Sequence, residues 1–164
     1  MTTQRRARLD PATFQLPVAK MRDGYYSDAY FTFTRDVLEH DDHRPDVLMQ
    51  VFQREHSVLG GIDEALAILR LCSGRRRADG GWDAGWDHLD VRALHDGDEV
   101  EPWETVLTIR GDYSLFAYLE TLYLGVLARR TLISRNVRDV VAAAGGKPIP
   151  VSYTHLTLPT IYSV

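Results

Sequence analysis

The chain has 164 residues, of which 45% are apolar and 26% are charged, and its formal charge is −4. These values are typical of a globular protein with one domain and part of another, and the acidity argues against nucleic-acid and anionic-membrane partners. No apolar run approaches the ~20 residues of a membrane span, no secretory signal is recognisable, and a single cysteine cannot form an internal disulfide. We therefore expect a cytoplasmic protein.

The first half of the chain predicts two helices separated by a strand. Residues 1–20 show no clear periodicity and are interpreted as an N-terminal extension. Residues 27–40 begin with an N-cap serine and carry apolar side chains at helical spacing, so they predict a helix. Residues 46–54 alternate between apolar and polar side chains, as a strand does. Residues 60–71 predict a second amphipathic helix, and residues 73–87 a loop rich in glycine and arginine.

The second half predicts a β unit followed by two helices. Residues 88–113 contain three short alternating stretches around an Asp-Gly turn, which indicates three strands. Residues 115–127 carry a wide apolar stripe at helical spacing, and Glu120 is their only charge. We expect this helix to be buried on most of its circumference. A second helix is expected over residues 132–144, ending at Gly145.

The last 14 residues, 151–164, are interpreted as a non-native tail. Val151 to Thr160 resemble the translation of a transposon-type sequencing adapter, so the tail is excluded from the fold prediction. The alternative is a genuine C-terminal strand. If the tail is an adapter, the natural protein is expected to continue beyond Pro150.

Three blocks of sequence, in order, resemble the nicotinate phosphoribosyltransferase family. The first is Tyr26 to Phe31, which is similar to an N-terminal Ser/Thr-Asp-x-Tyr motif. The second, residues 96–113, is similar to a β unit with a Gly-Asp turn. The third begins at Glu120-Thr121 and runs through a long helix to Thr131-Leu132-Ile133-Ser134 and Gly145-Gly146. The resemblance covers residues 22–148.

The resemblance implies an α+β fold. Residues 21–113 would form the N-terminal α/β sandwich of a type II phosphoribosyltransferase. Residues 114–150 would supply the opening helices of an α/β barrel that is otherwise truncated in this fragment.

The resemblance also implies an enzyme of NAD biosynthesis, which joins nicotinate to phosphoribosyl pyrophosphate and forms nicotinate mononucleotide. The family's full-length proteins are homodimers, and Mg²⁺ and ATP are expected for the full-length parent. The catalytic histidine of the family would lie beyond Pro150. The fragment alone is therefore expected to be inactive.

The resemblance places substrate-binding residues in two groups. Tyr30 would stack on the pyridine ring in the partner subunit, with Asp28 beside it at the helix start, although a core tyrosine and a partner for the helix dipole explain them equally well. Thr131, Ser134 and Arg135 lie where a helix is expected to restart, at a positive dipole end suited to an anion. For Arg135, an exposed or ion-paired helix face is the alternative.

Other functions remain open or are disfavoured by the sequence. The nearest enzyme alternative is a quinolinate phosphoribosyltransferase, which needs more Arg and Lys because its substrate is a dicarboxylate. A non-catalytic α+β binding module is an alternative of another class. The acidic and histidine clusters at residues 40–46 and 83–90 lack metal-ligand spacing, and Arg75 to Arg77 indicate a surface loop. Cys72 predicts a buried thiol.

Overall fold

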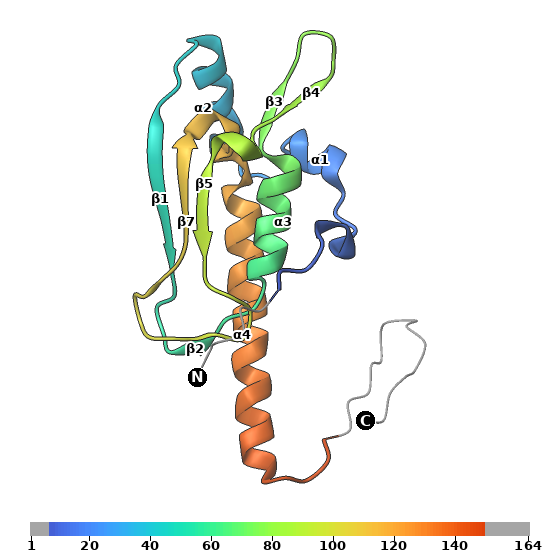
Figure 1. Ribbon diagram of the computed structural model, residues 1–164, viewed down its shortest axis with the longest axis vertical. Helices are drawn as coiled ribbons and strands as arrows, with labels where there is room; N and C mark the ends of the chain where they lie inside the picture. The colour runs from blue at the N-terminus through green and yellow to red at the C-terminus, as the bar shows by residue number, and fades with distance from the viewer. Residues whose placement is uncertain (1–6, 150–164) are drawn as a thin grey trace.

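The computed structural model describes residues 7–149 as a layered α+β sandwich, in which helices pack on one face of an antiparallel sheet (Figure 1). The predicted fold class is confirmed. The helices are α1 (Val18–Arg22), α2 (Ala29–His40), α3 (Ile62–Cys72) and α4 (Glu120–Ala144), and the strands are β1 (Asp46–Phe52), β2 (Ser57–Val58), β3 (Gly74–Arg76), β4 (Trp82–Ala84), β5 (Asp90–Ala93), β6 (Glu99–Val100) and β7 (Thr105–Asp112).

The main sheet has the order β1-β7-β5, with β7 antiparallel to both neighbours. Met49 and Val91 both pair with Ile109, so the inward-facing side chains of the three strands lie in one row. On β1 burial alternates with the strand period, and Leu48 on the outer face is 66% exposed. The sheet therefore buries one face only.

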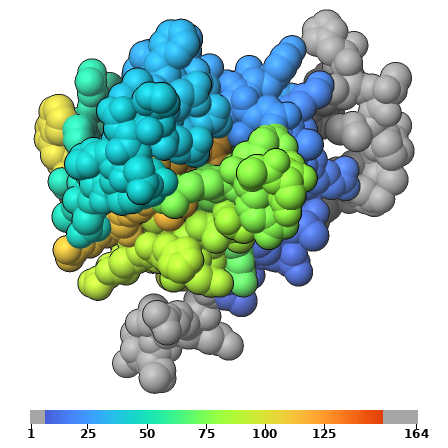
Figure 2. All heavy atoms as spheres, turned by 90° about the horizontal axis from the view of Figure 1, so that it is seen from above, coloured from blue at the N-terminus to red at the C-terminus, as the bar shows by residue number. Residues whose placement is uncertain are grey.

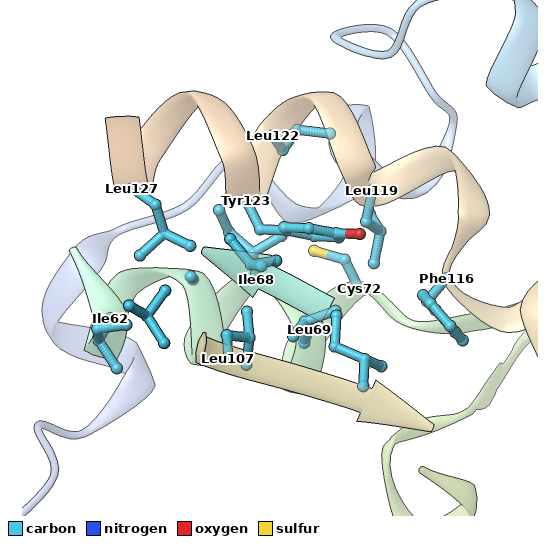
Figure 3. Close-up of a cluster of buried hydrophobic side chains, with 14 of the residues drawn as sticks. Ile62, Ile68, Leu69, Cys72, Leu107, Phe116, Leu119, Leu122, Tyr123 and Leu127 are labelled. Atoms are coloured by element: carbon cyan, nitrogen blue, oxygen red, sulfur yellow. The ribbon is translucent and has the colours of Figure 1, made fainter. Parts of the chain in front are cut away.

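The core lies between this inner face, α3 and the start of α4 (Figure 3). Side chains from the two helices and from β7 interdigitate there. The fully buried ones include Ile62, Ile68, Leu69, Cys72, Leu107, Phe116, Tyr118, Leu119, Tyr123 and Leu127.

Helix α4 is one continuous helix, so the prediction of two helices with a break near residue 130 is wrong. The arginines at the expected break are good helix formers, and they change the exposure of the helix without ending it. The predicted start is also wrong, because residues 113–119 form two 3-10 turns before the helix begins at Glu120. The predicted end is confirmed, with Gly145 in the left-handed conformation at φ 57°.

The two ends of α4 differ in burial. The 3-10 turns and the first two turns of α4 enter the core, but Leu124 is already 37% exposed, so the expected burial of most of the circumference is wrong for the helix itself. Beyond Thr131 the apolar side chains face outward, including Leu132 at 56% and Val137 at 55% exposed. In Figure 1 this end of α4 extends away from the sheet.

Two predicted irregular regions contain secondary structure. The loop at residues 73–87 holds the β3–β4 hairpin, in which Gly74 adopts φ 139° and a Cβ would collide with the Asp83 carbonyl. The N-terminal extension holds a 3-10 turn at Pro11–Phe14 and α1. Viewed from above, α2, the hairpin and the N-terminal segment lie side by side (Figure 2). The predicted adapter tail lies outside the described residues.

We expect a substitution in α4 to destabilise the protein according to how deeply the replaced side chain is buried. Replacing Leu127, which is 1% exposed, by alanine should lower the free energy of unfolding by about 2–5 kcal/mol, because it leaves a cavity in the core. Replacing Leu132, which is 56% exposed on the same helix, should change it by about 0.5 kcal/mol or less. Urea denaturation of both variants measures this difference, and equal losses would contradict the structure.

Candidate functional site

Two of the sequence motifs meet where α2 starts beside the first turn of α4. The Ser27 hydroxyl donates to the Tyr118 carbonyl. The backbone N–H of Asp28 donates to the Thr121 hydroxyl at 3.1 Å, and this hydroxyl donates to the Asp28 carboxylate at 3.0 Å. Residues about 90 positions apart in the sequence are thus joined by a reciprocal pair of hydrogen bonds.

Tyr30 lies on the first turn of α2 and is 59% exposed, so it is not an ordinary core tyrosine. Its ring lies against that of Phe31, with the centroids 4.1 Å apart. Desolvation, followed by the negative charges of Asp28 and Glu120, raises the pKa of the Tyr30 phenol above its ordinary value. The phenol therefore remains neutral and able to donate a hydrogen bond at neutral pH.

Glu120 and Tyr113 complete this corner. Burial raises the pKa of the Glu120 carboxyl, while a hydrogen bond from the Tyr113 hydroxyl opposes that shift. Burial also raises the pKa of Tyr113, and Glu120 and Tyr30 add to the effect. Sequence analysis did not select Tyr113, Glu120 or Thr121 as site residues. The available signal was a lone glutamate at the head of an apolar helix, since such a carboxylate needs a polar partner.

Thr131, Ser134 and Arg135 lie on a different part of α4. Thr131 is 3% exposed, and its hydroxyl accepts from the Gly60 N–H at 3.3 Å and donates to the Gly60 carbonyl at 3.2 Å. Ser134 also lies against Gly60. A Cβ added to Gly60 would come within 2.6 Å of the Ser134 Oγ. Arg135 forms an ion pair with Glu55. The structure thus brings these three residues together around the loop before α3.

The two predicted groups lie apart on this chain. Thr131 follows Thr121 by ten residues on one helix, a separation of about 15 Å at 1.5 Å per residue. The predicted anion site assumed that a second helix begins near Thr131. That assumption is wrong, because residues 131–135 lie inside the continuous α4. Their backbone N–H groups belong to the helix interior, where the dipole offers no free positive end.

The other polar clusters have structural partners. Arg75 pairs with Asp112, Arg76 with Asp23, and Arg77 with Asp79 and Asp83, so the predicted arginine loop is an ion-paired hairpin. Among residues 7–149 no three His, Cys, Asp or Glu side chains are grouped as metal ligands. None of the helices in this range is long and apolar enough to cross a membrane.

A groove of about 670 Å³ begins near Thr121, at the corner where the start of α2 meets α4, and follows α4. It runs between α4 on one side and α1 and α3 on the other. Apolar side chains predominate, and Arg129 and Arg130 lie along it. The lining residues are Pro17, Met21, Tyr26, Glu64, Ile68, Thr121, Leu122, Gly125, Val126, Arg129, Arg130 and Ile133.

Several solved structures share the fold of this chain. Nicotinate-nucleotide pyrophosphorylase from Pyrococcus furiosus is 26% identical over 88% of the chain and 33% of its own length, with a TM-score of 0.58. NadC from Streptococcus pyogenes is 20% identical over 84% of the chain and 44% of its own length, with a TM-score of 0.62. Human nicotinic acid phosphoribosyltransferase is 18% identical over 74% of the chain and 29% of its own length, with a TM-score of 0.58. The chain thus spans less than half of each.

The fold and the family match together define a phosphoribosyltransferase N-terminal domain. Residues 28–131 match the family described as quinolinate phosphoribosyl transferase, N-terminal domain, and the chain belongs to this family. The predicted membership of the nicotinate phosphoribosyltransferase family is therefore wrong. The likeness to the human nicotinic acid enzyme shows the shared fold alone. A comparison with curated proteins finds no match.

The Cys72 thiol should be inert in the folded protein. It is fully buried, and burial raises its pKa to about 11, so the thiolate is scarce at neutral pH. We expect negligible reaction with a disulfide reagent under native conditions and one equivalent of reaction in denaturant. Rapid native labelling at pH 7 would contradict the predicted buried thiol.

The Glu120 carboxyl should make stability depend on pH. Its pKa in the folded state is raised above 4.5, so the folded protein binds this proton more tightly than the unfolded chain does. Stability should therefore fall as the pH rises from about 4.5 through the raised pKa. Glu120→Gln, which cannot ionise, should remove that fall. Urea midpoints of both proteins between pH 4 and 7 measure it, and parallel curves would show that Glu120 has no such role.

Proposed function

We propose that the chain is the N-terminal part of a phosphoribosyltransferase that acts on a pyridine carboxylate, with quinolinate as the substrate. The observation that carries this proposal is the family match over residues 28–131, which contains both motifs of the Asp28–Thr121 corner. The predicted assignment to nicotinate is replaced by the quinolinate alternative. The relatives' greater length supports placing the other substrate-binding segments elsewhere in the full-length protein.

The proposed reaction follows from the substrate and product. Quinolinate is pyridine-2,3-dicarboxylate, and a nicotinate nucleotide keeps only the 3-carboxylate. The pyridine nitrogen therefore bonds to C1 of the ribose, pyrophosphate leaves with the electrons of the broken C–O bond, and the 2-carboxylate departs as CO₂ and is replaced by a proton. Positive charge develops on the ribose, so positioning and electrostatic stabilisation are the main contributions of the protein.

Within this proposal, Tyr30 provides an aromatic surface for the pyridine ring. Its exposure supports the role, because a phenol that is 59% exposed at a helix start can contact a ligand. Its neighbour Phe31 is buried, and the two ring centroids lie 4.1 Å apart. Ring stacking of this kind contributes about 0.5–1.5 kcal/mol.

Other expectations for the full-length protein stay predictions. Mg²⁺ and ATP were expected from the resemblance to the nicotinate family, which the family match replaces, and among residues 7–149 no three His, Cys, Asp or Glu side chains are grouped as metal ligands. A homodimer in which Tyr30 enters the partner's site also stays a prediction, as do the domain boundaries at residues 20, 113 and 150.

The test is the activity of the full-length protein. The open reading frame should be recovered from the source genome past the codon for Pro150, expressed, and supplied with phosphoribosyl pyrophosphate and either quinolinate or nicotinate. We expect quinolinate to release pyrophosphate and CO₂ in equal amounts. Tyr30→Ala should raise the KM for quinolinate by about three- to tenfold through lost stacking, and Tyr30→Phe, which keeps the ring, should change it less.

Three results would count against the proposal. Turnover of nicotinate alone would reject quinolinate as the substrate, and no turnover of either acid would reject the enzyme assignment. An unchanged KM in a folded Tyr30→Ala protein would remove Tyr30 from the site.

A further inference from the structure

We infer that Thr121 and Asp28 are positioning residues, which hold the exposed Tyr30 ring at a fixed place on the molecule. The inference rests on the proposed function only for what the ring contacts. The fixing of the ring itself is a property of the described chain.

The first step concerns the cap of α2. Asp28 occupies the N-cap position, where an aspartate ordinarily accepts a hydrogen bond from its own helix and contributes about 1 kcal/mol. Here the Asp28 side chain makes no capping bond and instead accepts from the Thr121 hydroxyl at 3.0 Å. The carboxylate thus joins two helices rather than stabilising one.

The second step concerns the geometry of the joint. The Asp28 N–H donates to the same hydroxyl at 3.1 Å, so Thr121 binds both the backbone and the side chain of one residue. One position earlier, Ser27 donates to the Tyr118 carbonyl. The two anchors lie one helical turn apart on the segment leading into α4, and together they fix both the place and the direction of the α2 start.

The third step connects the joint to the ring. Tyr30 follows Asp28 by two residues, in the first turn of α2, where helices fray unless they are held. Tyr30 is 59% exposed, and the ring contact found for it is with Phe31, a residue of the same helix. Its position therefore depends on the helix that carries it. Asp28 was predicted to bind substrate, but its carboxylate is engaged by Thr121, which makes it a positioning residue.

Hydrogen exchange of the chain tests the joint without any substrate. Thr121→Val keeps the shape and loses both hydrogen bonds, so the amides of residues 31–33, the first of α2 with hydrogen-bond acceptors, should exchange about tenfold faster. Thr121→Ser keeps the hydroxyl and should restore the rate to within about twofold. Thr131→Val is the matched control, because it loses a comparable pair of bonds to Gly60 on the same helix. It should leave the exchange of residues 31–33 unchanged.

Kinetics of the full-length protein then test the consequence. Thr121→Val should raise the KM for quinolinate, but by no more than Tyr30→Ala does, because Thr121 acts through the ring. Changes in kcat and in the KM for phosphoribosyl pyrophosphate should be smaller, and Thr121→Ser should restore the KM for quinolinate. Unchanged exchange in Thr121→Val would show that the Asp28–Thr121 hydrogen bonds do not hold the start of α2. Faster exchange with an unchanged KM for quinolinate would show that they do not position Tyr30 for the substrate. Faster exchange in a full-length protein that turns over neither acid would instead reject the proposed function.

Discussion

The side chain of Tyr118 lies where three helical segments meet, and the packing of the domain depends on it. Its hydroxyl donates to the Cys72 carbonyl at the end of α3, and the Arg35 guanidinium of α2 lies 4.9 Å from its ring centroid. Because the phenol is completely buried, its pKa is raised and the hydrogen bond satisfies a group that would otherwise be costly to bury. One residue of a 3-10 turn thereby orients α2 and α3 relative to α4.

The candidate site is built on the same junction. Ser27 bonds to the Tyr118 carbonyl, and Asp28 bonds to Thr121 three residues further on. The exposed Tyr30 is therefore carried by a helix whose start is fixed to the core and not to a loop. Such support suits a ring that must meet a planar ligand, because binding then costs little ordering of the protein.

The sequence predicted the elements well and their junctions poorly. Periodicity identified β1, α3 and the strands around β7, because each of them turns one face to the core. It also identified α2, although Phe31 is the only buried side chain of that helix. It failed at Arg129 to Thr131, where polar side chains change exposure without ending α4. The Asp28–Thr121 bond joins residues 93 positions apart and has no local signal. The β3–β4 hairpin was missed for a related reason, since its arginines are held by ion pairs rather than by an apolar face.

The electrostatics of the corner limit what it can recognise. Asp28 and Glu120 both lie near the Tyr30 phenol, and both raise its pKa through their negative charge. A dicarboxylate is repelled by such surroundings, so this corner can contribute an aromatic surface but not the charge recognition of a substrate such as quinolinate. The cations must come from other residues. Under the proposed function, Arg129 is a candidate on the described chain, because it lies along the groove, eight residues from Thr121 and about 12 Å away at the helical rise. Arg130 lies along the same groove, but it is paired with Glu64. Under the proposed function, ring contact and carboxylate recognition are therefore assigned to different elements, the ring contact to α2 and the carboxylate to α4.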